Sequence, residues 1–195
     1  MKKVLIICIV FAVLITAYSA SKSSVLAEQE KGGRVYECDY KTLSVNTEIQ
    51  TLYKGEEISI SGNILRFIED PLTAKTQSGK ILGYAGDAYG LIEQDDHGIY
   101  VDGKFELNMN GKFMLLGNSY QLKDAKGNVV AKAEFDPFSV SGKIVDANEN
   151  IIAIYSSGVM LNDYKVIIYD NDVCSDLAIL MIMASYVSDA KFDEN

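Results

Sequence analysis

Short runs of apolar residues, many alternating with polar ones, follow one another along the chain and are separated by turn residues. Residues 57–61 (Glu-Ile-Ser-Ile-Ser) alternate strictly, as is typical of a half-buried β-strand. Strands are predicted at 57–61, 64–68, 80–84, 90–93, 99–101, 104–107, 112–116, 119–124, 129–133, 139–146, 151–155 and 163–170. The two prolines, Pro71 and Pro137, interrupt none of them, so the pattern predicts a long β meander.

Pairs of turn residues separate these runs and predict where the chain reverses. Residues 102–103 (Asp-Gly) and 110–111 (Asn-Gly) have the composition of two-residue hairpin turns, which need positive φ angles. Residues 62–63 (Gly-Asn) predict a further turn. The segment 95–98, which contains the single histidine, His97, predicts a loop ahead of the run at 99–101.

Three aspartates, Asp124, Asp146 and Asp170, end three of the predicted strands at similar spacing. Turn residues follow the first two, at 125–128 and 147–150. Aspartate in such a place accepts hydrogen bonds from the backbone of its own turn. Calcium ligation is the alternative, but the spacing of an EF-hand loop is missing. Turn formation is therefore the preferred interpretation.

The alternation stops at residues 173–187, where an apolar segment of Leu, Ile, Met and Ala favours a helix. Asp172 or Ser175 can cap its N-terminus, and Asp176 in the first turn suits the helix dipole. The 11 residues of the charge-free run 177–187 reach only about 16 Å as a helix. A membrane span must cross about 30 Å of hydrocarbon, so a buried core helix is preferred over a second span.

A helix that is apolar on every side must be enclosed, and strands are the elements available to enclose it. A sheet that wraps around a helix closes on itself and leaves no exposed edge. The predicted fold is therefore mainly β, a closed antiparallel β-barrel wrapped around an apolar C-terminal helix. Such a barrel has no internal room for a large ligand.

The N-terminus has the layout of a targeting segment. Lys2 and Lys3 precede an uncharged apolar run, and small residues follow it. Cleavage after Ser19 fits a secretory signal, while residues 4–20 just reach the length of an uncleaved membrane anchor. Both readings place the rest of the chain outside the cytoplasm. The predicted organisation is a signal or anchor at 1–20, a linker at 21–33 and one domain at 34–195.

Charge and composition exclude several functions. The formal net charge of −9 repels phosphate backbones, so a nucleic-acid partner is not expected. One histidine and no Cys-x-x-Cys pair argue against a zinc site built from Cys and His side chains. Any Ser-His-Asp or Cys-His machinery would have to use His97, which is interpreted as a turn residue. No catalytic, cofactor-binding or metal site is predicted, and no cofactor is expected.

Two other sets of side chains leave alternatives open. Cys38 and Cys174 could form a disulfide outside the cytoplasm. The preferred interpretation is that both are buried thiols that do not pair. Tyr84, Tyr89 and Tyr100 could form a binding surface, although Tyr is also an ordinary strand residue.

The C-terminal half resembles the LURP-one-related proteins, which share the tubby C-terminal-like fold with tubby and the phospholipid scramblases. The resemblance runs from residue 112 to residue 189 and rests on the motifs at 117–124, 127–128, 143–146 and 163–170 and on the apolar run 177–187. It implies a barrel of about twelve strands around a C-terminal helix. Tubby-type members bind phosphoinositide head groups through basic side chains. Arg34 and Arg66 are the two arginines of the predicted domain, and no basic lipid pocket transfers residue by residue.

The expected function is an exported or membrane-anchored, non-enzymatic binding module whose ligand is a protein, a lipid or an envelope component. The alternatives are a structural or stress-related envelope protein and a carboxylate-based hydrolase. A contiguous exposed aromatic or aliphatic patch would favour binding. A cleft that holds two carboxylates with raised pKa would favour the hydrolase.

Overall fold

A computed structural model of the chain describes residues 32–43, 46–63, 72–86, 96–112, 118–136, 141–157 and 163–192. Apart from Arg34, the first residue of the first strand, the barrel lies within Val35–Asn195, one of the two units into which contacts divide the chain. The predicted targeting segment at 1–20, nearly all of the linker at 21–33 and the runs at 64–68 and 90–93 lie outside the described residues.

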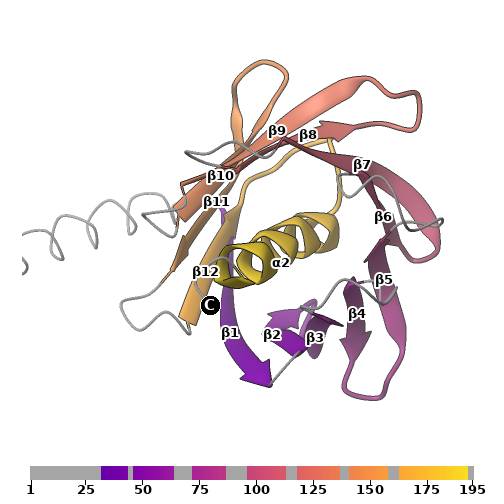
Figure 1. Cartoon of the computed structure of the whole chain (residues 1–195), viewed down its shortest axis with the longest axis vertical. Coiled ribbons are helices and arrows are strands. Elements are labelled where there is room, and N and C mark those ends of the chain that lie inside the picture. Colours follow the sequence, from indigo (N-terminus) through magenta and orange to yellow (C-terminus); the bar gives the residue numbers. More distant parts are fainter. Residues whose placement is uncertain are drawn as a thin grey trace, which may run out of the picture. The chain divides into compact units, whose positions relative to one another are not determined.

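Twelve strands of the described chain form a closed antiparallel barrel, in which each strand pairs with the next and β12 pairs with β1. The strands are β1 (Arg34–Leu43), β2 (Asn46–Tyr53), β3 (Glu56–Asn63), β4 (Leu72–Thr76), β5 (Ile81–Gly86), β6 (Asp96–Val101), β7 (Lys104–Lys112), β8 (Asn118–Lys123), β9 (Val129–Asp136), β10 (Ser141–Asp146), β11 (Ile151–Ser157) and β12 (Asp163–Ile168). The helix α2 (Asp176–Phe192) follows them and lies inside the ring of strands (Figure 1). The predicted fold class is confirmed.

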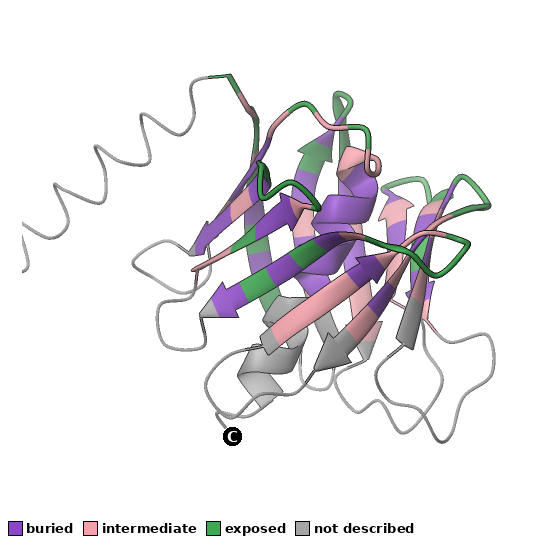
Figure 2. Ribbon diagram, turned by 90° about the horizontal axis from the view of Figure 1, so that it is seen from above, coloured by how far each residue is buried: buried purple, intermediate pink, exposed green. Residues whose placement is uncertain are grey.

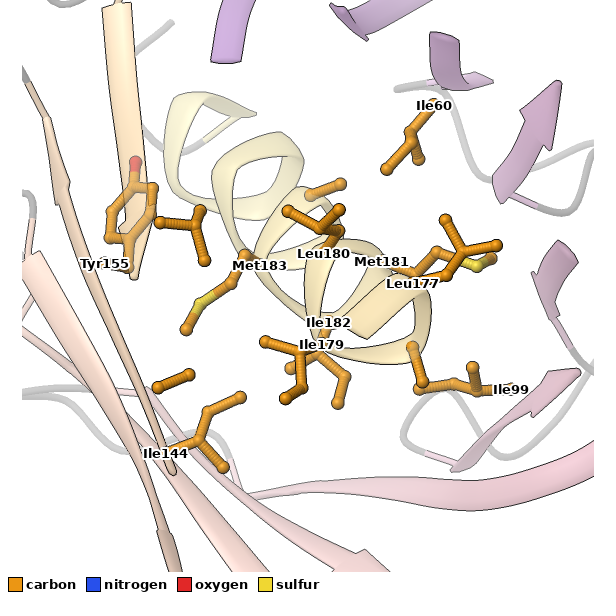
Figure 3. Packing of buried hydrophobic residues seen from close by; sticks show 14 of the residues in the cluster. Ile60, Ile99, Ile144, Tyr155, Leu177, Ile179, Leu180, Met181, Ile182 and Met183 are labelled. Carbon is orange, nitrogen blue, oxygen red and sulfur yellow. The ribbon is translucent and has the colours of Figure 1, made fainter. Parts of the chain in front are cut away.

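The core is the interface between the inner face of the barrel and the whole circumference of α2. Every residue from Leu177 to Ser185 is buried. Along the strands, buried and accessible residues alternate (Figure 2). Ile60, Ile99 and Ile144 reach the helix from three sides of the barrel (Figure 3). Each large aliphatic side chain buried in this way contributes about 1.5–3 kcal/mol, so enclosure of the helix stabilises both elements.

Two strands hold the N-terminus of α2 in place. The Ser175 hydroxyl accepts a hydrogen bond from the Ala178 amide at 3.3 Å, which makes Ser175 the N-cap. Glu106 of β7 accepts hydrogen bonds from the Ser175 amide at 2.8 Å and from its hydroxyl at 2.9 Å. Tyr36 of β1 donates to Asp176 at 2.5 Å. Of the two caps that the sequence allowed, Ser175 is the one used.

An interior row of aromatic rings crosses six strands on one side of the barrel, and five of these strands contribute a ring. Neighbouring centroids lie 5.4–6.4 Å apart along the series Tyr40, Tyr164, Tyr155, Phe135 and Tyr120. The strand between Phe135 and Tyr155 contributes Gly142, which pairs with both. A Cβ on Gly142 would collide with the ring of Phe135, so the missing side chain is what lets this ring lie across β10.

Side chains pack closely around the described part of α2, from Leu177 to Ser185. A void of about 10 Å³, lined among others by Cys38, Tyr164 and Met183, remains beside the helix. A space of that size holds at most one water. Across the described part of the chain, we find no helix whose length and apolarity would suffice to cross a membrane.

Three sequence predictions about turns are wrong, and in each the strand continues through the turn residues. Residues 110–111 lie in β7 and pair with Gln121 and Tyr120 of β8. Residues 62–63 lie in β3 and pair with β2. His97 is a strand residue of β6, paired with Met109, rather than part of a loop. Strand pairing satisfies the backbone groups of these residues better than a local turn would.

Candidate functional site

Register partners in an antiparallel sheet share a face, so the pairing fixes which side chains lie together on the outside of the barrel. Ile49, Ile60 and Ile99 are buried and face the helix, and their chain neighbours therefore face outward. One unbroken row of paired residues crosses the outer face of seven strands, from β1 to β7. Its members are Lys41, Glu48, Ser61, Thr73, Tyr84, Tyr100 and Phe105.

The β5–β7 end of this row is an aromatic cluster, made of Tyr84, Tyr100 and Phe105. The rings of Tyr84 and Tyr100 are stacked, with centroids 4.6 Å apart and planes 12° apart. Phe105 meets Tyr100 edge-on at 5.5 Å. Tyr84 and Phe105 remain 38% and 37% exposed, respectively, so the cluster is accessible on the surface. Tyr89, the third tyrosine of the predicted binding surface, lies outside the described residues.

A register shift brings Phe105 into the cluster. Ile99 pairs with Leu107, whereas the next residue, Tyr100, pairs with Phe105, so Glu106 is the extra residue of a β-bulge. The bulge turns Phe105 outward and leaves Glu106 free to reach the cap of α2. Strict alternation along 104–107 would have placed Phe105 on the buried face with Leu107. Phe105 is therefore not among the predicted site residues, because nothing in the pattern of 104–107 indicates the bulge.

The stacking decides which ring surface is open. Tyr100 lies close over Gly98, where a Cβ would approach its Cε2 to 2.9 Å, and its ring covers one face of Tyr84. Since Tyr100 comes from β6, the other face of Tyr84 is turned toward β4. Thr73 of β4 is the register partner of Tyr84. The open aromatic surface therefore borders directly on hydroxyl side chains.

Three short hydroxyl side chains, Ser59, Ser61 and Thr73, lie next to that surface on β3 and β4, and we call them the hydroxyl strip. Ser61 pairs with Thr73, and all three are partly accessible. A polar network bounds the strip on β1 and β2. In it, Lys41 donates to Gln50 at 2.6 Å, and Gln50 donates to Glu48 at 2.9 Å. Gln50 and Glu48 are the register partners of Ser59 and Ser61.

The structure also contains a surface depression with two carboxylates. Glu56 and Glu57 border it together with Thr76, Gln77 and Ser78 at one end of the barrel. Gln77 donates a hydrogen bond to Glu57 at 2.5 Å. Both glutamates are exposed to solvent rather than enclosed by apolar side chains.

Asp124 and Asp146 build two matching turns, as predicted. In each, one carboxylate oxygen accepts hydrogen bonds from two backbone amides of the turn at 2.8–2.9 Å, and the other accepts from the side chain of Asn128 or Asn150 at 2.9 Å. These asparagine hydrogen bonds are the main reason why the pKa of each aspartate is lowered. The described residues contain no group of three or more His, Cys, Asp or Glu side chains placed to hold a metal ion.

The third aspartate of the predicted series does not build a matching turn. β12 ends at Ile168, and Asn171 rather than Asp170 accepts the turn hydrogen bonds, from the amides of Val173 and Cys174 at 3.1 and 3.2 Å. The chain needs a different connection here because it leads into α2 instead of reversing into another strand.

Cys38 and Cys174 are both free thiols, as the preferred prediction had it, but only Cys38 is fully buried and Cys174 is half-buried. Burial raises the pKa of Cys38 to about 11 and that of Cys174 to about 12, with the nearby carboxylate of Glu106 adding to the second shift. Thiols of this kind are protonated at neutral pH and are poor nucleophiles.

His97 pairs through its backbone with Met109 in β6 and β7. Its side chain is not among those that the structure describes.

Comparison with known proteins gives little further information. No protein-family model matches the chain, and no curated protein matches it. Among solved structures, an Arabidopsis thaliana protein solved by X-ray crystallography is a distant neighbour, with 11% identity and a TM-score of 0.36. The alignment covers 85% of this chain and 96% of the other. A likeness at this level shows no family.

Proposed function

We propose that this chain is a non-enzymatic binding module that acts outside the cytoplasm, exported or anchored by residues 4–20, and that it binds an envelope component through the outer face of β3–β7. The observation that carries the proposal is the exposed aromatic cluster of Tyr84, Tyr100 and Phe105. Exposed aromatic groups beside polar side chains are characteristic of binding surfaces.

The packing around Leu177–Ser185 supports an external site, because the void of about 10 Å³ beside this part of α2 is too small for a ligand. The alternative of a carboxylate-based hydrolase has less support, since Glu56 and Glu57 are exposed and the resolved pKa shifts of Asp124 and Asp146 are downward. We also propose that the chain is related to the LURP-one-related and tubby-like proteins. This part of the proposal rests on the sequence motifs of the C-terminal half.

The test is binding of a detergent-solubilised envelope extract to the immobilised full chain. Wild-type protein should give a saturable signal, and the double variant Tyr84→Ala/Tyr100→Ala should lose at least about tenfold in apparent affinity. Ile151→Ser is the matched control, because Ile151 is an exposed apolar residue (46%) on β11, away from the cluster. Equal thermal melting of all variants shows that the fold is intact. Equal binding by wild type and double variant would refute the proposed site.

The location outside the cytoplasm is tested separately, by the mass of the mature protein from its native host and its partition between membrane and medium. A product that begins near Ala20 or Ser21, or an intact product held in the membrane with its domain accessible to added protease, is expected. An intact product confined to the cytoplasm would contradict this part of the proposal.

A further inference from the structure

We infer that the ligand of this outer face is a neutral, hydroxyl-rich glycan, which lies across β3–β6 with one sugar ring against Tyr84. The inference rests on the proposed function and specifies the chemistry of its ligand. Three observations carry it: the orientation of the Tyr84 ring, the hydroxyl strip beside it and the charge along the row.

The first observation is that the open face of Tyr84 is turned toward β4. A pyranose ring presents several C–H bonds on one face, and these carry partial positive charge. An aromatic ring has a negative face, which attracts such C–H groups in addition to burying apolar surface. The ring of Tyr100 is stacked on the other face of Tyr84, with the two centroids 4.6 Å apart. The orientation of the Tyr84 ring is therefore fixed before a ligand binds. A ring that is already fixed in place loses less conformational entropy when the ligand binds.

The second observation is the hydroxyl strip of Ser59, Ser61 and Thr73 in front of this ring. Each hydroxyl both donates and accepts hydrogen bonds, as sugar hydroxyls do, so the two sets are complementary without any change of protonation. The side chains are short, and a flat ligand can therefore approach the sheet while its C–H face meets Tyr84. Beyond the strip, Gln50 and Glu48 offer further acceptors and donors for a second sugar unit.

The third observation is the distribution of charge. Five consecutive positions of the row, Ser61, Thr73, Tyr84, Tyr100 and Phe105, are uncharged, although the chain as a whole has a net charge of −9. Lys75, the register partner of Ser59, is the one lysine that pairs with the hydroxyl strip. An anionic polymer or an anionic lipid surface would be repelled by the net charge of the chain and would meet this single cation rather than a row of cations. A neutral ligand matches the uncharged stretch and meets no such repulsion.

The extent of the row fits a chain-like ligand better than a single sugar. The strands from β2 to β6 are each separated by about 4.8 Å, so the row from Glu48 to Tyr100 spans roughly 19 Å along the curved sheet. Several sugar units can be accommodated over that length. Specificity then comes from hydroxyl hydrogen bonds on β2–β4, and the main affinity comes from the ring stacked on Tyr84.

The experiment measures binding of the immobilised full chain to dissolved neutral polysaccharides, a β-glucan and an α-mannan, with polygalacturonate and phosphatidylglycerol vesicles as anionic comparisons. At least one neutral polymer should bind, and both anionic probes should not. Tyr84→Ala should weaken binding about tenfold, whereas Tyr84→Phe keeps the aromatic face and should retain it. Ser61→Ala/Thr73→Val should also weaken binding, and the control Ile151→Ser should not.

The outcomes separate this inference from the proposed function. If the envelope extract binds through Tyr84 but neither neutral polymer binds, and treatment of the extract with protease or removal of its lipid abolishes the signal, the glycan inference is overturned and the binding module stands. If neither the extract nor any polymer binds the wild-type chain, both fail. Binding to a neutral polymer that Tyr84→Ala leaves unchanged would also overturn the inference, because the stacked ring would then play no part.

Discussion

Replacement of Gly142 by alanine tests the interior packing most sharply, because two physical effects predict opposite signs. Glycine is a poor strand residue, and alanine restricts the unfolded chain, so propensity alone predicts a more stable protein. The structure predicts the reverse. The new Cβ would collide with the ring of Phe135, and it would stand 2.9 Å from the carbonyl oxygen of Glu134, which cannot move without disturbing the β9–β10 pairing.

The magnitude follows from what Phe135 must give up. The ring is buried, with 4% exposure, and contacts Tyr120 and Tyr155 at centroid distances of 5.9 and 6.4 Å. Rotation away from the Cβ costs about 0.5–1.5 kcal/mol in rotamer strain and weakens two aromatic pairs worth about 0.5–1.5 kcal/mol each. Gly142→Ala should therefore destabilise the fold by roughly 2–4 kcal/mol, or about 4–16 °C in Tm for a domain of this size.

The assay is urea unfolding followed by circular dichroism, combined with a double-mutant cycle. Phe135→Leu removes the colliding ring, so Gly142→Ala should cost much less in the Phe135→Leu background than in the wild type. A coupling of about 1–3 kcal/mol is expected for groups in direct contact. If Gly142→Ala leaves stability unchanged or raises it, or if the two substitutions are additive, the packing of this ring across β10 is not as the structure has it.

Three further predictions concern local groups. Glu149 has a φ of +64°, so Glu149→Gly should raise stability by about 0.5–1 kcal/mol in urea unfolding, and a fall would contradict the turn geometry. In a Cys8→Ser variant, Cys38 and Cys174 should resist a thiol reagent at about pH 8 until the chain unfolds. Since their pKa values are raised from 9.0, their contribution to stability is complete below about pH 9 and is lost as pH rises toward 11 and 12. Rapid labelling of the folded chain would refute their burial. Asn128→Ala should raise the lowered pKa of Asp124 toward its ordinary value, measured by carboxyl NMR against the matching turn as internal control. Because that pKa is depressed in the fold, its stabilising effect is present above the unfolded-state pKa and is lost as pH falls through the folded-state value, and an unchanged pKa in the variant would refute the assigned cause.

Local patterns predicted the elements whose physics is local. The 102–103 hairpin forms, with φ angles of 49° and 74° at Asp102 and Gly103, because both residues tolerate positive φ. Because the predicted helix is apolar on every side, it has to be enclosed by the strands. A sheet that encloses a helix closes on itself, so the closed barrel could be predicted as well. The Asn-Gly pair at 110–111 failed as a turn signal because β7 continues to Lys112 and pairs with β8. That pairing depends on a partner strand, which local composition does not contain.

Other features depend on long-range geometry and could not be predicted. β1 and β2 carry weak alternation, and they are strands because Cys38, Tyr40 and Ile49 complete the core around α2. The candidate site depends on register across six strand pairs and on the bulge at Glu106, neither of which appears in a single segment. Tyr84 and Tyr100 could therefore be named as candidates from the sequence. Their stacking, and the place of Phe105 beside them, could not be predicted.

The most direct test of the central claim, that the outer face of β3–β7 is the binding surface, is hydrogen exchange of the full chain with and without the solubilised envelope extract, followed peptide by peptide. The account predicts slower exchange confined to peptides that cover Glu56–Asn63, Leu72–Thr76, Ile81–Gly86, Asp96–Val101 and Lys104–Lys112, with peptides of β8–β11 unchanged. Protection located on β8–β11, or at the turns of Asp124 and Asp146 instead of this face, would contradict it.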